Sequence, residues 1–278
     1  MPIAVNIDDQ VEHLTVFLES PDTQPVTARL AGAGSLRREL EALLATAPSG
    51  SSPANYRELL VRQNVASKGS AAARMWAWKR LKLRYALDPA IVEHRAFLAG
   101  MQDSADPSER GLLCFLMFAR TDRLFREVTF EYMSPHLERE GTEIEPAIIE
   151  VAIRERAEAS SLQWSGNTLD RAGTHLLAAL KDFGLIRGSR SRRTVRPRLG
   201  VQVTLFAARL GHYEGLTDRQ VLDSRWFRLF GLERDQVVDL FYVATRFGVL
   251  DFRMQADVVE LRLPPLEEKI EEQREVQG

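Results

Sequence analysis

The stretch "NTLDRAGTHLLAALKDFGLIRG", from Asn167 to Gly188, contains a helix together with its end signal. Its apolar residues recur every three or four positions, the spacing that gathers them on one face of an α-helix. Asn167 can cap the first turn, and Gly184 lies where a left-handed residue commonly ends a helix. The tripeptide Asp182-Phe183-Gly184 therefore predicts a helix stop, followed by a short strand and a hairpin.

The same order of elements recurs near the C-terminus, in "ERDQVVDLFYVATRFGVLDFRMQADVVELRL", residues 233–263. A helical pattern ends at Gly248, and two alternating segments then predict a hairpin with one buried face. A helix followed directly by a hairpin is how a winged helix ends. The repeat predicts two winged-helix-like units, and a chance resemblance of two helix caps is the alternative.

The rest of the chain has helical periodicity. Three helices are predicted at 35–47, with Ser35 able to cap the first, at 54–63 and at 70–87. The expected fold class is mainly α, a multi-helix protein with winged-helix-like modules carrying short β-hairpins. The expected organisation is a loosely attached lead-in segment (1–30), an N-terminal helical domain of helix-turn-helix type (31–100), acidic middle helices (101–160), a C-terminal winged-helix-like region (161–265) and a charged tail (266–278).

Composition limits the classes of function. The 278 residues carry a formal net charge of −2, so any affinity for a polyanion must come from local clusters of Lys and Arg. The single cysteine, Cys114, excludes an intrachain disulfide and a cysteine-based zinc site, and it is expected to be a buried apolar side chain. No apolar run approaches the roughly 20 residues that cross a bilayer. We expect a cytoplasmic protein without a membrane partner.

The strongest local cluster of charge follows the first helix stop. Six guanidinium groups with no nearby acidic residue repel one another by about 1 kcal/mol per close pair even in water, and an anionic partner would relieve this. A solvated loop that aids solubility is the alternative. The preceding helix adds Arg171 and Lys181, beside Thr174 and His175, on its expected outer face. The cluster, called the hairpin arginines below, consists of Arg187, Arg190, Arg192, Arg193, Arg196 and Arg198.

A second basic segment lies between Glu58 and Asp88, where no acidic residue occurs. Its aromatic residues, Trp76, Trp78 and Tyr85, could stack on nucleic-acid bases, but aromatic residues at helical spacing are more often core. In that alternative the basic side chains are merely solvated. The candidate contacts with DNA in this segment are Lys68, Arg74, Lys79, Arg80, Lys82 and Arg84.

Catalytic motifs are weak. The five histidines are scattered, with no pair at metal-ligand spacing on one helix, and "AGAGS" lacks the Gly-Lys-Ser/Thr of a phosphate-binding loop. The Asp-Phe-Gly tripeptide has no kinase catalytic loop or glycine-rich loop to accompany it. We therefore predict no catalytic residue, no metal and no cofactor. An enzyme of unrecognised type is the remaining alternative.

Three segments together resemble the BrxA proteins of bacterial BREX anti-phage systems. They are "NVASKGSAAARMWAWKRLKLRY", "LQWSGNTLDRAGTHLLAALKDFGLIRG" and "SRWFRLFGLERDQVV", and the likeness covers about residues 30–265. The resemblance implies a mainly helical, non-enzymatic DNA-binding component that works beside a methyltransferase, an ATPase and a phosphatase-like protein. Its motifs are helix and cap patterns, so it supplies no active-site residues.

The expected function is binding of double-stranded DNA through its phosphates, with little base-specific readout. One alternative is a protein-interaction scaffold, in which the arginines meet an acidic protein surface. Another is an RNA-binding or transcription-regulating helical protein. The sequence leaves the oligomeric state open, a homo-oligomer included.

Overall fold

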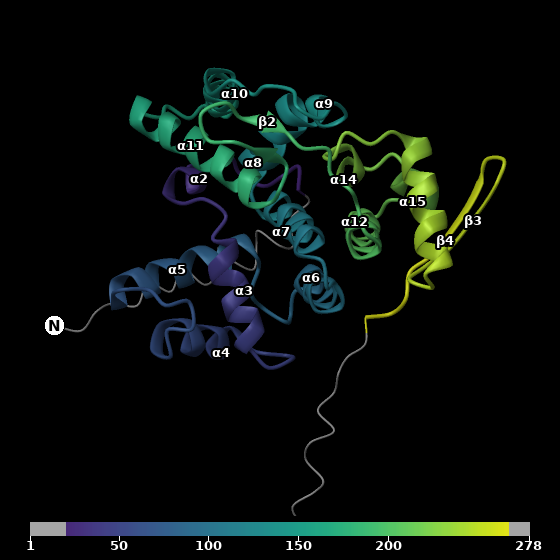
Figure 1. Ribbon diagram of the computed structural model, residues 1–278, viewed down its shortest axis with the longest axis horizontal. Helices are drawn as coiled ribbons and strands as arrows, with labels where there is room; N and C mark the ends of the chain where they lie inside the picture. Colours follow the sequence, from purple (N-terminus) through teal and green to yellow (C-terminus); the bar gives the residue numbers. More distant parts are fainter. Residues whose placement is uncertain (1–20, 267–278) are drawn as a thin grey trace, which may run out of the picture.

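The computed structural model describes residues 21–266, which form mainly helices and two short antiparallel hairpins (Figure 1). The predicted fold class is confirmed. The helices are α2 (Arg29–Gly32), α3 (Arg37–Thr46), α4 (Pro53–Arg57), the π-helical turn η1 (Glu58–Arg62), α5 (Ala71–Arg84), α6 (Val92–Asp103), α7 (Pro107–Thr121), α8 (Arg123–Val128), the π-helical turn η2 (Thr129–Met133), α9 (Ser134–Leu137), α10 (Pro146–Ala159), α11 (Gly166–Asp182), α12 (Val201–Tyr213), α13 (Asp218–Val221), α14 (Arg225–Arg228) and α15 (Arg234–Arg246). The strands are β1 (Ile186–Arg187), β2 (Arg193–Thr194), β3 (Asp251–Gln255) and β4 (Val258–Arg262).

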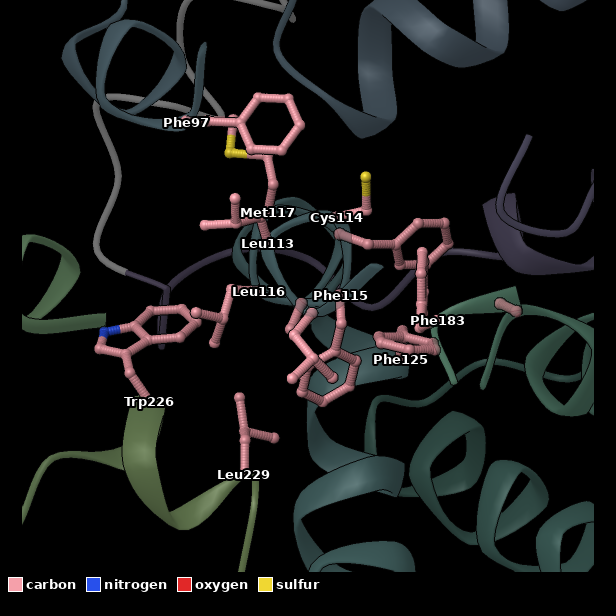
Figure 2. Close-up of a cluster of buried hydrophobic side chains, with 14 of the residues drawn as sticks. Phe97, Leu113, Cys114, Phe115, Leu116, Met117, Phe125, Phe183, Trp226 and Leu229 are labelled. Carbon is pink, nitrogen blue, oxygen red and sulfur yellow. The ribbon is translucent and has the colours of Figure 1, made fainter. Parts of the chain in front are cut away.

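Helix α7 lies at the centre of the core. Every residue from Gly111 to Thr121 is buried, so the long apolar run of the sequence is a central helix. Phe115 packs against the rings of Phe125 and Phe183, with centroids 5.8 and 6.0 Å away (Figure 2). On another side of α7, Trp226 and Leu229 approach from the C-terminal third of the chain (Figure 2). None of the described helices is long and apolar enough to cross a membrane.

The end of α11 comes very close to α7. A side chain carbon at Gly111 would lie 2.9 Å from the carbonyl oxygen of Phe183, which leaves room for glycine only. Cys114, three residues along α7, is fully buried, as predicted. Burial raises the pKa of the Cys114 thiol to about 12, so it is protonated at neutral pH.

Residues 21–30 are firmly attached. Val26 and Leu30 belong to the core, and Arg123 donates a hydrogen bond of 3.0 Å to the carbonyl of Gln24. Arg126 donates to the carbonyl of Pro21. The prediction of a loosely attached lead-in is wrong for these residues, because their apolar side chains and carbonyl groups are tied to the middle helices. The predictions for 1–20 and for the tail from 267 lie outside the described residues.

The predicted helix stops at Gly184 and Gly248 are both confirmed. The backbone φ is +84° at Gly184 and +69° at Gly248, in the left-handed region. The amide of Leu185 donates to Leu180 and that of Gly184 to Lys181, and the same two bonds recur in the second unit, from 249 to 244 and from 248 to 245. This is the Schellman arrangement, which satisfies the last carbonyl groups of a helix.

The start of α11 differs from the prediction. Ser165 is its cap, and the Ser165 Oγ accepts a hydrogen bond from the amide of Thr168 at 3.3 Å. Asn167 is exposed within the first turn. The error arose because either residue can cap a helix, and the first apolar position does not choose between them.

The two hairpins are held in different ways. Strand β2 pairs with β1 on one edge, and on its other edge residues 141–144 add bonds such as Gly141 N to Thr194 O at 2.9 Å. Strands β3 and β4 pair only with each other among the described residues, and Phe252 opposite Leu261 forms their buried face. The first helix and hairpin, residues 166–194, are called the arginine unit below, and the second, residues 234–262, the C-terminal unit.

Candidate nucleic-acid interface

The hairpin arginines lie on and directly after a short β-ribbon whose inner face is anchored. Thr194 is fully buried, and its hydroxyl donates to the carbonyl of Arg139 at 2.7 Å while accepting from the amide of Thr142 at 3.0 Å. Because side chains alternate along a strand, the neighbouring Arg193 points outward. Arg192 is half-buried, and the exposed members are Arg187, Arg190, Arg193, Arg196 and Arg198.

Carboxylates neutralise little of this charge. Among the described residues, the one ion pair of the hairpin arginines joins Arg187 Nη1 to Glu140 Oε1 at 3.6 Å, and both side chains are more than half exposed. Such surface pairs contribute about 0–1 kcal/mol. Glu143, on the paired segment, instead accepts a hydrogen bond from Ser191. The other hairpin arginines face solvent without a carboxylate partner in the described chain.

The outer stripe of α11 continues this surface. Arg171, Thr174 and Lys181 are exposed, and Lys181 Nζ donates to Ser189 Oγ at 3.0 Å, which links the helix to the hairpin loop. His175 is not on this surface, because its Nδ1 lies 3.0 Å from the carbonyl oxygen of Leu30 beneath α2. Helix α2 therefore covers part of the face that the sequence had suggested for DNA.

The candidates of the first basic segment separate by burial. Lys79 is exposed, Lys68 is paired with Glu39, and three others are half-buried: Arg74, Arg80 and Lys82. Trp78 and Tyr85 are core residues, whereas Trp76 is 40% exposed.

Arg84 differs from the other candidates of this segment in its burial. It is only 5% exposed, donates to the carbonyl of Ala33 at 2.5 Å, and lies with its guanidinium 5.0 Å from the centre of the Phe118 ring. Arg84 therefore does not lie on an open surface, because its Nη2 holds α2 to the core, and a contact with DNA stays a prediction.

Helix α2 contacts both α5, which carries the first basic segment, and α11 of the arginine unit. It packs on α11, and Arg80 of α5 lies against it so closely that a side chain carbon at Gly32 would be 2.8 Å from Arg80 Nη2. Figure 1 shows α2 between α11 and α5. Helices α5 and α11, about a hundred residues apart in the sequence, therefore both contact α2. Arg29 of α2 is a basic residue that the sequence did not predict as part of either cluster, because a helix of four residues shows no period.

The described residues offer little for catalysis. They contain no group of three or more His, Cys, Asp and Glu able to hold a metal. His94 is fully buried, with Nδ1 3.1 Å from the carbonyl oxygen of Tyr85. Burial lowers the pKa of His94 to about 4, which leaves the ring neutral at pH 7. Both His94 and Cys114 are therefore core residues, buried and uncharged at neutral pH.

Comparison with known families identifies a match over most of the chain. The BrxA family model matches residues 25–211, which is more than half of the chain and includes α2, α5 and the whole arginine unit. The match ends before the C-terminal unit. No curated protein matches the chain. The chain belongs to the BrxA family and is thereby associated with the BREX phage-defence systems.

Proposed function

We propose that this chain is a non-enzymatic, double-stranded DNA-binding component of a BREX system, and that it holds the duplex by its phosphates with little base-specific readout. The observation that carries the proposal is the set of exposed hairpin arginines without carboxylate partners among the described residues. A planar guanidinium matches the geometry of phosphate oxygens and remains charged at every physiological pH.

The shape of the surface supports phosphate contact over deep insertion into a groove. A recognition helix needs a free outer face, but α2 covers α11 at His175. What α11 leaves exposed is a stripe that includes Arg171 and Lys181 and leads to the hairpin loop. A basic stripe next to a ribbon of arginines is suited to following the sugar-phosphate backbone, which carries no direct sequence information.

A salt titration tests the mechanism. Neutralising about six phosphates should make the logarithm of the association constant fall with the logarithm of salt concentration at a slope of about −5. Fluorescence anisotropy with a labelled duplex of 25 base pairs, from 50 to 200 mM salt, measures it, and two unrelated sequences should give the same affinity. A slope near zero, or a strong preference for one sequence, would contradict the proposal.

A protein-interaction scaffold is the second candidate. Phe247 is 73% and Val258 71% exposed on the C-terminal unit, and exposed apolar side chains that gather in a patch mark protein-protein contacts. In this role the unit would hold other BREX proteins, such as the methyltransferase, the ATPase or the phosphatase-like component. The change of both residues to Asp should abolish co-purification with such a partner and leave DNA binding intact.

Competition separates DNA from RNA as the polyanion. A duplex RNA of the same sequence presents an A-form helix and 2′-hydroxyl groups, which change the spacing of the phosphates. We expect it to displace the labelled DNA at least about tenfold less well. Equal or better displacement by RNA would favour an RNA-binding role.

A further inference from the structure

A small opening lies where α2 meets α5, and three arginines converge on it. The lining residues are Arg29, Arg80, Leu83, Arg84, Thr121 and Asp122. Arg29 and Arg80 are half-buried at its mouth, and Arg84 is buried behind them. The opening is therefore a cationic indentation between α2, α5 and the connection from α7 to α8.

One guanidinium nitrogen there has no partner. Arg84 Nη2 donates to backbone carbonyls, but Arg84 Nη1 is shielded from solvent and makes no hydrogen bond within the described residues. A buried donor left unpaired destabilises the fold, and more so when it is charged. A hydrogen-bond acceptor placed in the opening would remove that cost.

The charge of the lining also lacks compensation. Asp122 is its single carboxylate, and the Asp122 oxygen accepts a hydrogen bond from the amide of Phe125 at 3.0 Å. Burial raises the pKa of Asp122, so its charge is disfavoured. Burial, with a smaller effect from the charge of Arg80, lowers the pKa of Arg84 to about 10, although Asp122 acts in the opposite direction. An anion beside Arg84 would favour its charged form.

The size of the opening decides which anion fits. Its cavity volume is about 10 Å³, close to the ~10–15 Å³ that a single water-sized group occupies. A free phosphate cannot enter whole. One non-bridging oxygen can enter while the rest of the group stays at the mouth, between Arg29 and Arg80. The phosphates of a duplex present their oxygens outward in this way.

We propose that this opening is a phosphate subsite, which receives one non-bridging oxygen of the DNA backbone on Arg84 Nη1 while Arg29 and Arg80 hold the phosphate from both sides. The inference rests on the proposed DNA-binding function and extends it to a second contact, separate from the hairpin arginines. Arg84 then has a structural role and a ligand role at once, and α2 supplies one side of the subsite through Arg29.

Substitution of the two outer arginines tests the subsite. Arg29→Ala and Arg80→Ala should each weaken binding of the labelled duplex ~3- to 10-fold and reduce the salt slope by about 1. Arg80→Lys, which keeps the charge, should restore most of the slope. Arg57→Ala is the matched control, because Arg57 is an exposed arginine of α4 with no ion pair in the described chain, and it should change neither quantity.

A second measurement does not depend on DNA. At matched ionic strength, sulfate should raise the melting temperature of the wild-type protein above its value in chloride, and the gain should be smaller in Arg29→Ala and Arg80→Ala. Unchanged salt slopes in folded variants, together with an unchanged response to sulfate, would overturn the subsite. Loss of the sulfate response in a chain that never binds DNA would support the subsite and contradict the proposed function instead.

Discussion

The arginine unit and the C-terminal unit have the same helix end and opposite arrangements of charge. Both helices stop at a left-handed glycine with the same pair of backbone hydrogen bonds. In the C-terminal unit, Arg253 lies 3.4 Å from Asp251 and Arg262 lies 3.3 Å from Glu260. In the arginine unit the ribbon has no carboxylate of its own, and one arginine has a partner on a neighbouring segment.

This difference separates what forms a helix–hairpin unit from what gives it a ligand. Caps, apolar spacing and the alternation of strand residues produce the backbone in both places. The charges on the outer face are not needed for that backbone. A unit with paired charges and exposed apolar residues is suited to proteins, and a unit with unpaired arginines to a polyanion. The BrxA family model covers the arginine unit and ends before the C-terminal unit.

Charge reversal of two ribbon arginines should produce the largest difference in DNA affinity between the two units. Arg190→Glu with Arg193→Glu should weaken DNA binding ~100-fold or more, because contacts with phosphate are lost and repulsion is gained. Arg253→Glu with Arg262→Glu makes the same change in charge on the C-terminal hairpin and should weaken binding less than about threefold, through net charge only. Anisotropy titrations measure both.

All four of these arginines are exposed. Both double variants should therefore keep their free energies of unfolding within about ±0.5 kcal/mol of the wild type, as ordinary surface substitutions do. Equal losses of affinity in the two variants would show that any cationic hairpin suffices. The assignment of DNA to the arginine unit would then be wrong.

Removal of one threonine hydroxyl from each unit should show how differently the two hairpins are anchored. Thr194→Val removes the acceptor of the Thr142 amide and one of two donors to the carbonyl of Arg139, which also accepts from the Thr142 hydroxyl. The loss of two partly buried bonds should lower the free energy of unfolding by about 1–3 kcal/mol. The matched change in the C-terminal unit is Thr245→Val, which removes the acceptor for the amide of Phe252. It should cost less, about 1 kcal/mol, since one partly buried bond is lost.

Urea denaturation measures both changes, and the DNA affinity of the Thr194 variant tells whether the anchor also orders the arginines. A variant with full stability and reduced affinity would mean that residues 141–144 position the ribbon without stabilising the fold. Unchanged stability together with unchanged affinity would contradict the anchoring role of Thr194.

Local chemistry explains which features the sequence predicted. The helices α3, α5, α11 and α15, both stops and both hairpins follow from residues within one or two turns of each other. The burial of Arg84 and the partial covering of His175 do not, because both depend on where α2 packs. The pairing of 141–144 with β2 was equally hidden, since it joins residues some 50 positions apart, largely through backbone groups.

The candidate site divides in the same way. The clusters of arginine could be read from composition, and most of the hairpin arginines are exposed as a surface site requires. The contact of α2 with both α5 and α11, and the place of Arg29 beside Arg80, required the tertiary structure. A four-residue helix between a proline-containing stretch and a glycine-rich stretch has too few positions to show a period.

The smallest expected effect tests the likeness of the two units. Gly184→Ala and Gly248→Ala both place a side chain at a positive φ, and a Cβ at either position meets no atom within 4 Å, so the cost is that of the backbone conformation, about 1 kcal/mol each. Gly166→Ala, in equally open space at the start of α11 and without a positive φ, is the control and should be neutral or slightly stabilising. Equal losses in urea denaturation, with DNA affinity unchanged in both, would mean that the caps are interchangeable and that charge is what differs. A much larger loss at Gly184 would mean instead that the first cap is also held by its close contact with α7, and the two units would then differ in backbone energetics as well as in ligand.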